Sequence, residues 1–336
     1  MTDRNAPPAP LRRVALLGAS GTIGRATAAA LIRRGHEVVC FVRPRAGQPG
    51  PPDPVTFGLP AGVALCPVDP TDAAALGAAF ADERFAAVIS CLASRTGEPA
   101  DAWEIDHRAQ SHALAAARAA GVAHFVLLSA ICVQKPLLAF QRAKLAFEAE
   151  LAAAGLRYSI VRPTAFFKSL SGQVERLRRG KPFLIFGDGR RTACKPISDA
   201  DLADYLVGCL DNEARWNRVL PIGGPGPALT PREQGEMLFA LLGQTPRFRS
   251  VPIGILDAMI GLLATLGRVA PRLAAKAELA RIGRYYATES MLVLDPATGH
   301  YEAEATPSTG SDRLIDHYRA LIAGEIADQR GDHAVF

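Results

Sequence analysis

The sequence lacks a long hydrophobic run and a block of like charge, and it is poor in aromatic residues. Only 7% of its 336 residues are aromatic, and the formal net charge is +5. No apolar stretch reaches the about 18–20 residues that a membrane-spanning helix needs. Because no Lys/Arg block is present, we expect no nucleic-acid partner. A hydrophobic content of 49% excludes a disordered chain, and the length of 336 residues predicts one large or two small domains.

The six cysteines lie far apart, without a CxxC pair or a Cys/His group at zinc spacing, so we expect no metal site. Cys40 and Cys91 lie inside apolar runs, where a free thiol behaves as a small hydrophobic group. The region before Arg13 has no hydrophobic segment of the signal-peptide kind. These features predict a cytoplasmic protein with reduced thiols.

The first half of the chain alternates short apolar runs with helical patterns. Strands are predicted at 13–18, 36–42, 63–68, 86–92, 124–129 and 158–162. Helices are predicted at 25–34, 72–81, 102–120 and 138–154. Strands that are apolar on both faces indicate an α/β protein with a parallel sheet covered by helices. Right-handed crossovers then give a doubly wound Rossmann-type sheet.

After Pro163 the alternation loosens. Helices are predicted at 170–179, 199–210, 230–242, 253–266 and 312–323, and strands at 183–186 and 219–222. We expect a smaller α+β substrate-binding region at the carboxyl edge of the sheet, formed by additions rather than by an independent core. The predicted division is a disordered leader at 1–12, an NADP(H)-binding domain at 13–163, a substrate-binding region interleaved with the sheet at 164–324, and a tail at 325–336.

A glycine-rich turn lies between the first predicted strand and the first predicted helix. Gly18, Gly21 and Gly24 have the spacing GxxGxxG, which is typical of short-chain dehydrogenase/reductase relatives. In this context Gly18 permits the tight turn, Gly21 lets the backbone approach a pyrophosphate, and Gly24 lets the helix pack on the strand. The other predicted cofactor contacts of the turn are Ser20, Thr22 and Ile23. The alternative is a glycine-rich turn without a ligand.

The end of the second predicted strand decides the type of cofactor. An acidic residue there would bind the ribose 2′-hydroxyl group, but this sequence has Arg43, with Arg45 and Arg25 near it. Cations suit a 2′-phosphate, so we predict NADPH, although a solvated arginine is the alternative. Asp69, after the third strand, is predicted either to accept a hydrogen bond from the adenine amino group or to cap the next helix.

The helix predicted at 138–154 carries Lys144 four residues after Phe140. Short-chain reductases hold a tyrosine and a lysine at this spacing, on one helix face, where the ammonium group lowers the tyrosine pKa. Phenylalanine replaces the tyrosine here, which disfavours ordinary carbonyl chemistry. We predict that Lys144 holds the nicotinamide ribose and donates a proton, directly or through water; a solvated lysine is the alternative. Ser129, at the carboxyl end of the fifth strand, is predicted to be catalytic or to cap a turn.

Several short segments carry a more specific signal than the glycine-rich turn. They are 133–137, 162–170, 187–189, 194–198, 220–226, 229–231 and 283–291. Together they closely resemble the divinyl chlorophyllide a 8-vinyl-reductases, which are atypical short-chain dehydrogenase/reductases of the NmrA-like group. The resemblance runs from about residue 13 to residue 321, and the phenylalanine at position 140 belongs to it.

The resemblance implies an NADPH-dependent reduction of the C8 vinyl group of a tetrapyrrole to ethyl, in chlorophyll or bacteriochlorophyll biosynthesis. The substrate would be 3,8-divinyl chlorophyllide or protochlorophyllide. Pro163 would lie over the nicotinamide. Phe140 would line the substrate site, Phe166 and Phe167 would stack on the macrocycle, and Lys168 would meet its propionate. The alternative is that both of the latter phenylalanines belong to the core and that Lys168 is solvated.

The apolar helix predicted at 253–266 is too short to span a bilayer. It is interpreted as a buried packing helix first, and otherwise as a wall of the tetrapyrrole pocket or a shallow anchor on photosynthetic membranes. The sequence gives no oligomeric state.

Two other functions compete with the vinyl reductase. One is a non-enzymatic NmrA-like regulator that binds NADP(H), and the other is an isoflavone-reductase-like enzyme acting on a smaller aromatic substrate. The second-half segments and the retained Lys144 favour the vinyl reductase.

Overall fold

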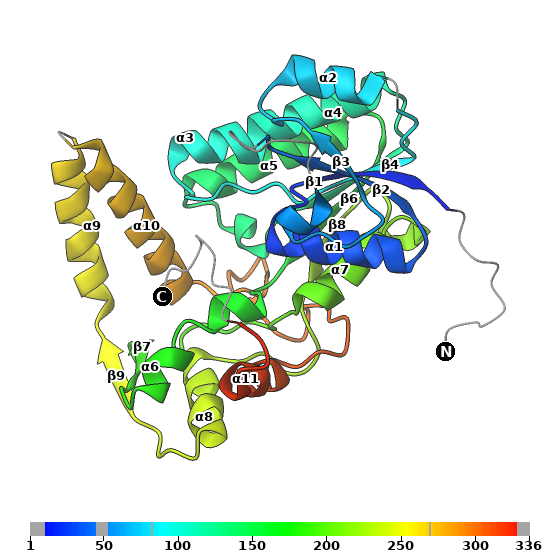
Figure 1. The fold of residues 1–336 in the computed structure, drawn as a ribbon. Helices are drawn as coiled ribbons and strands as arrows, with labels where there is room; N and C mark the ends of the chain where they lie inside the picture. Colours follow the sequence, from blue (N-terminus) through cyan, green and yellow to red (C-terminus); the bar gives the residue numbers. More distant parts are fainter. Residues whose placement is uncertain (1–10, 45–52, 82, 269, 328–336) are drawn as a thin grey trace.

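A computed structural model describes residues 11–44, 53–81, 83–268 and 270–327. Seven parallel strands form the main sheet, in the order β3-β2-β1-β4-β5-β6-β8 (Figure 1). The strands are β1 Arg13–Leu17, β2 Glu37–Val42, β3 Ala64–Pro67, β4 Ala87–Ser90, β5 His124–Leu128, β6 Arg157–Pro163 and β8 Arg218–Ile222. The predicted doubly wound Rossmann-type sheet is thereby confirmed.

Helices cover both faces of this sheet. On one face lie α1 (Thr22–Arg33) and α7 (Asp199–Gly208), and on the other lie α2 (Ala73–Ala81), α4 (Ala109–Ala119) and α5 (Ala139–Ala153). Each face of the sheet has its own hydrophobic core, and successive residues of β1 point to opposite faces. Val14 and Leu16 lie in the core under α1 and α7, while Ala15 and Leu17 lie in the core under α2, α4 and α5. Burial of every β1 side chain after Arg13 explains its continuous apolar sequence.

The long helix predicted after β4 is divided in three. It begins as α3 (Pro99–Ala102), continues as a π-helical segment, η2 (Trp103–Arg108), and ends as α4. A π-helical turn shifts the side chains that follow it around the helix axis and is frequent at functional sites.

The second half contributes to two different cores. Strand β8 and helix α7 complete the main sheet and its cover. Strand β7 (Phe183–Phe186) pairs with β9 (Phe248–Val251), and both pack with α6 (Val174–Arg178), α8 (Pro231–Leu241) and α11 (Leu314–Ala323). This packing buries Leu177, Phe239 and Tyr318 in a separate hydrophobic cluster. The expectation that the second half lacks a core of its own is therefore wrong.

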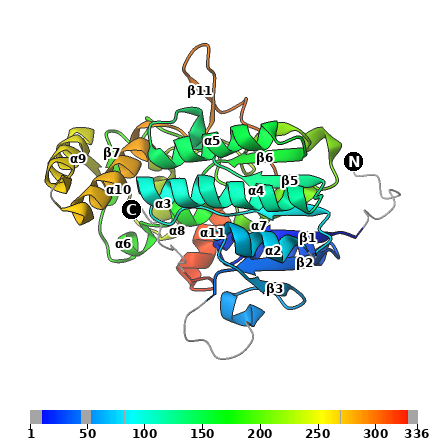
Figure 2. The same ribbon diagram turned by 90° about the horizontal axis from the view of Figure 1, so that it is seen from above.

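Helices α9 (Ile253–Gly267) and α10 (Pro271–Thr288) form a hairpin that extends away from the sheet (Figures 1 and 2). Helix α10 was not anticipated from the sequence. No residue of α9 is buried, so the expected burial of this apolar helix is wrong. None of the helices in the described parts of the chain has the length and apolar character needed to cross a membrane.

Several short elements connect these parts. They are η1 (Pro54–Phe57), η3 (Ile131–Gln134), η4 (Phe167–Leu170), η5 (Glu213–Arg215), β10 (Val293–Leu294) and β11 (Tyr301–Glu302). The helix predicted at 170–179 is thus reduced to η4 and the short α6. Most of the predicted leader and tail lies outside the described residues, and the domain boundaries at 163 and 324 stay predictions.

Candidate active site

The turn between β1 and α1 excludes side chains at two of its glycines. Gly18 has a φ of +70°, and a Cβ there would lie 2.5 Å from the backbone carbonyl of Cys91. A Cβ on Gly24 would lie 2.1 Å from the carbonyl oxygen of Gly18. Gly21 is the exposed N-cap of α1, and no side chain caps the first N–H groups of that helix. The turn therefore leaves open the kind of helix N-terminus that binds a diphosphate.

The remaining residues of the turn differ in what they offer a ligand. Ser20 is exposed and Thr22 is half-buried, so both hydroxyl groups lie near the surface of the turn. The Ile23 side chain is buried in the core, which leaves only its backbone available to a cofactor. The fit to a dinucleotide thus rests on backbone groups and small polar side chains.

The carboxyl end of β2 presents a cation. Arg43 directly follows β2 and is exposed, while Arg45 lies outside the described residues. Arg25 lies against Gly58, because a Cβ on that glycine would meet the Arg25 guanidinium at 2.8 Å. An exposed cation at this strand end is suited to a 2′-phosphate.

Asp69 forms a local turn after β3. Its Oδ1 accepts hydrogen bonds from the backbone N–H and the hydroxyl group of Thr71, at 3.0 and 2.9 Å. The helix that follows is capped by Asp72, which accepts from the Ala75 N–H at 3.0 Å. The capping alternative for Asp69 is therefore wrong, and its contact with adenine stays a prediction.

Lys144 lies in a buried ion pair. Its Nζ is 2.9 Å from Oδ1 of Asp106, and the two side chains are only 10% and 1% exposed. A buried ammonium group persists only with such a partner. The alternative of a solvated helix lysine is therefore wrong.

Asp106 owes its position to the π-helical segment η2. Its Oδ1 also accepts a hydrogen bond from the Ser94 N–H at 3.2 Å, in the loop after β4. The same loop is fixed by Asp101, whose Oδ2 accepts from the Ser94 hydroxyl group at 2.6 Å. Burial acts to raise the pKa of Asp101. Four hydrogen bonds, one each from Ser94 and Arg95 and two from Thr96, together outweigh burial and hold this pKa below its usual range. The loop is thus a rigid support for the Lys144–Asp106 pair.

Ser129 forms a hydrogen bond with a buried carboxylate of α5 and not with Lys144. Its hydroxyl group donates to Oε1 of Glu148, which lies four residues after Lys144 on α5. Glu148 is also bound by Arg162, whose Nε lies 3.1 Å from Oε1. The hydroxyl proton of Ser129 is committed to this buried carboxylate, and a catalytic role for Ser129 stays a prediction.

Comparison with known proteins agrees with this geometry. Residues 18–213 match the NAD(P)H-binding family. The chain is 54% identical to the chloroplastic divinyl chlorophyllide a 8-vinyl-reductase of Oryza sativa subsp. indica, over 96% of this chain and 82% of that one. It is 52% identical to the protein of the same name from Zea mays, over 98% of this chain and 84% of that one. The chain belongs to the divinyl chlorophyllide a 8-vinyl-reductase family.

The fold has wider relatives. A solved structure of AtPrR2 with NADP+ and (+)pinoresinol superimposes with a TM-score of 0.69. It covers 93% of this chain and 99% of that one at 17% identity, which supports the fold alone. Membership of the vinyl-reductase family rests on the plant proteins.

Phe140 links the nucleotide-binding half of this vinyl reductase to the hairpin. It is half-buried and packs in one cluster with Ile282 and Tyr285 of α10. The Tyr285 hydroxyl group donates to the carbonyl oxygen of Cys132 at 2.8 Å. Burial raises the pKa of Tyr285 above its usual range, so this hydroxyl group stays protonated. Its proton is held by the Cys132 carbonyl oxygen.

The loop after β6 divides its predicted site residues between the core and the site. Pro163 is buried at the end of β6, and Phe166 is half-buried against the cluster under α7. Phe167 is 5% exposed and packs with Leu177 and Phe239, away from the main sheet. Because its ring is buried, Phe167 is a core residue, and its predicted stacking on the substrate is corrected. The stacking of Phe166 on the macrocycle stays a prediction.

Lys168 is neither solvated nor directed to open space. It is half-buried, and its Nζ donates to Oγ1 of Thr22, the first residue of α1, at 2.5 Å. The alternative of a solvated Lys168 is therefore wrong. Its contact with a substrate propionate stays a prediction.

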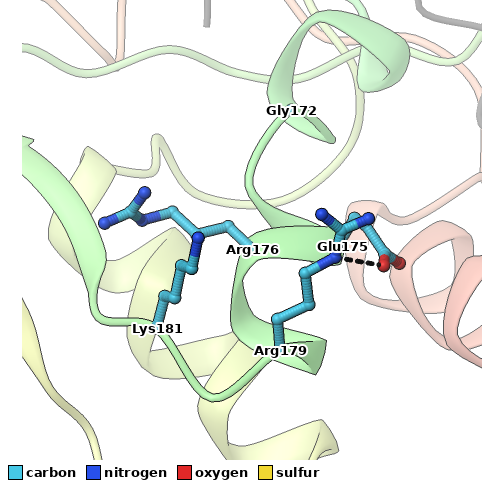
Figure 3. Close-up of a pocket in the computed structure, with 5 residues that line it drawn as sticks. All are labelled: Gly172, Glu175, Arg176, Arg179 and Lys181. Carbon is cyan, nitrogen blue, oxygen red and sulfur yellow. Dashed lines mark hydrogen bonds and ion pairs between the residues drawn. The ribbon is translucent and has the colours of Figure 1, made fainter.

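An open depression of about 290 Å³ lies beside α6, lined by Gly172, Glu175, Arg176, Arg179 and Lys181 (Figure 3). The Arg179 guanidinium pairs with Glu175 at 3.0 Å, and Arg176 donates to the carbonyl oxygen of Pro182 at 2.7 Å. None of the predicted site residues lines it, so we do not assign the substrate to this depression.

Two residues near the site, Glu148 and Asp106, are not among those predicted from the sequence. Glu148 had a usable signal, because its spacing of four from Lys144 places both on one face of α5. Asp106 had none: nothing in the sequence at 103–108 predicts the π-helical turn that brings its carboxylate to Lys144.

Proposed function

We propose that the protein catalyses the NADPH-dependent reduction of the 8-vinyl group of 3,8-divinyl chlorophyllide, or of its protochlorophyllide counterpart, to ethyl. Identity of 54% along nearly the whole chain to a plant divinyl chlorophyllide a 8-vinyl-reductase is the observation that carries this proposal. The site geometry supports it, because a buried lysine is present at the catalytic position while a proton-donating tyrosine is not.

The cofactor site fits NADPH. The tight shape of the glycine-rich turn requires glycine at Gly18 and Gly24, and no side chain caps the α1 N-terminus, so its N–H groups are available to the diphosphate. Exposed Arg43 supplies a positive charge at the strand end where the 2′-phosphate would lie. NADPH, when bound, supplies the hydride that adds to the terminal carbon of the vinyl group.

Lys144 provides the proton in this proposal. Addition at the terminal carbon moves the vinyl electron pair to the inner carbon, where the macrocycle delocalises the charge. The Lys144 ammonium then protonates the inner carbon, directly or through water, which completes the ethyl group. Asp106 orients the ammonium group from 2.9 Å.

Absorbance spectroscopy tests the reaction. Purified protein incubated with NADPH and divinyl chlorophyllide should shift the Soret band to shorter wavelength as the vinyl group leaves conjugation. Tight NADPH binding without this shift would favour the NmrA-like regulator, and turnover of a smaller aromatic substrate alone would favour the isoflavone-reductase-like enzyme.

We also propose that the α9–α10 hairpin contacts an anionic membrane surface. Ile255, Met259, Leu262 and Leu266 are 56%, 41%, 62% and 43% exposed and follow one another at helical spacing. Such an apolar face on an exposed helix is suited to the boundary between headgroups and acyl chains. Residues 253–288 carry five Lys/Arg against two Asp/Glu, which favours anionic headgroups over zwitterionic ones.

Flotation with vesicles tests this contact. The protein should float with vesicles rich in phosphatidylglycerol, and Leu262→Glu should abolish flotation. Val55→Glu is the matched control, because Val55 is an apolar residue of η1 that is 74% exposed. Equal flotation of both variants, or a dimer that Leu262→Glu converts to a monomer without any vesicle binding, would contradict the proposal.

A further inference from the structure

Lys168 connects two segments that are far apart in the sequence. It lies in η4, after β6, and its Nζ reaches Oγ1 of Thr22 at 2.5 Å, across 146 residues. Thr22 is the first residue of α1, immediately after the N-cap Gly21. The loop after β6, which is expected to contact the substrate, therefore places the Lys168 ammonium group at the glycine-rich turn between β1 and α1.

Asp199 partly balances the charge of Lys168, and the ammonium group keeps unused hydrogen-bond donors. Asp199, the first residue of α7, attracts the ammonium group, and its Oδ1 is buried without a hydrogen-bond partner in the described structure. Burial lowers the pKa of Lys168, with Asp199 opposing this effect and Arg25 adding to it. Burial raises the pKa of Asp199, against the opposing effects of Lys168 and Arg25. An ammonium group has three donors, and Thr22 accepts from one of them.

We propose that Lys168 binds the diphosphate of the bound dinucleotide, and not a carboxylate of the substrate. The α1 N-terminus has no capping side chain and attracts an anion through its free N–H groups. An ammonium group 2.5 Å from the Thr22 hydroxyl lies within reach of the same anion. Asp199 keeps the Lys168 side chain directed to the turn before the cofactor arrives. The proposal rests on the proposed function only in that the protein binds NADPH.

Two variants separate this role from the alternatives. In Lys168→Met, binding of NADPH and of NADH to the full-length protein, followed by cofactor fluorescence, should weaken by about tenfold or more, since a charge-assisted hydrogen bond is lost. The ratio of the two affinities should stay constant, because both cofactors carry the diphosphate. Lys168→Arg retains the charge and should bind both cofactors more tightly than Lys168→Met.

Arg43→Ala is the matched control. It should weaken NADPH far more than NADH, because the 2′-phosphate belongs to NADPH alone. This opposite pattern in the affinity ratio distinguishes the diphosphate from the 2′-phosphate within one assay.

Unchanged affinity of folded Lys168→Met for both cofactors, with a raised KM for the tetrapyrrole, would overturn the proposal in favour of a substrate carboxylate. Unchanged affinity together with a lowered Tm would overturn it in favour of a structural role. If Lys168→Met fails to fold, Lys168→Gln carries the same test. Wild-type protein that binds NADPH but leaves the vinyl group intact would refute the proposed reaction and leave this assignment standing.

Discussion

The Lys144–Asp106 pair supports a sharp test, because both partners are buried. Replacing Asp106 by leucine leaves the Lys144 ammonium in a site where it is only 10% exposed and has no other ion-pair partner in the described residues. Removing one partner of a buried ion pair typically costs about 3–5 kcal/mol of the free energy of unfolding. We expect Asp106→Leu to lose an amount in this range. Lys144→Met should lose a similar amount of unfolding free energy, because it leaves the buried Asp106 carboxylate without its ion-pair partner.

The double variant Lys144→Met/Asp106→Leu removes both charges and fills the space with apolar groups. A buried pair replaced by apolar residues is often neutral in stability, but Asp106→Leu also leaves the buried Ser94 N–H without its acceptor. We therefore expect the double variant to lose about 1–3 kcal/mol, well below the sum of the two single variants. Its turnover should nonetheless fall by about 10²–10⁴-fold, because the proton donor is gone. Stability would thus recover in part while activity would not.

Urea unfolding followed by circular dichroism, with linear extrapolation to water, measures these losses. Glu104→Gln is the control: it breaks an exposed pair with Arg108 in the same π-helical segment and should cost less than about 1 kcal/mol. Single variants that lose no more than this control, or a double variant that loses the sum of the two singles, would refute the reasoning.

Three further predictions concern the turn, the strand end and the sheet. Gly24→Ala should abolish measurable NADPH binding, because its Cβ would lie 2.1 Å from the Gly18 carbonyl oxygen; Gly77→Ala, with no atom within 4 Å, should bind normally. Arg43→Ala should raise the NADPH Kd by about tenfold or more in a fluorescence titration, with little change for NADH. The pKa of His124 is lowered to about 4, chiefly by burial and further by Arg157 and Arg12. Since the unfolded chain takes up this proton first, the free energy of unfolding should fall by about 3 kcal/mol as pH drops from 6.5 to 4, and His124→Gln should remove that part of the slope in acid-unfolding curves.

The sequence predicted the sheet well because its signals are local. Each strand is a short apolar run, and Gly18 and Gly24 must be glycine for reasons of space that the spacing already implies. The position of Lys144 followed from its spacing to Phe140 on one helix.

Four differences between the prediction and the structure have physical causes that no local pattern contains. Asp106 reaches Lys144 through a π-helical turn, and Lys168 reaches Thr22 across 146 residues. Phe166 and Phe167 are adjacent residues of the same type, so the sequence does not distinguish them. Tertiary packing places the Phe167 ring in the second core and the Phe166 ring against the core of the main sheet. Apolar composition suggested burial of α9, but in the described part of the chain it packs mainly against α10, and none of its residues is buried. Helix α10, by contrast, has a local signal in the sequence, a proline at its first turn followed by strong helix formers.

The position of an isotope label tests the central claim most directly. The protein should be incubated with divinyl chlorophyllide and NADPH that carries deuterium at the transferred position, and the product analysed by mass spectrometry and NMR. We expect one deuterium in the terminal methyl carbon of the new ethyl group, with the inner carbon receiving its proton from Lys144 or water. Deuterium at the inner carbon, or recovery of unreacted divinyl substrate from protein that binds NADPH, would contradict the account.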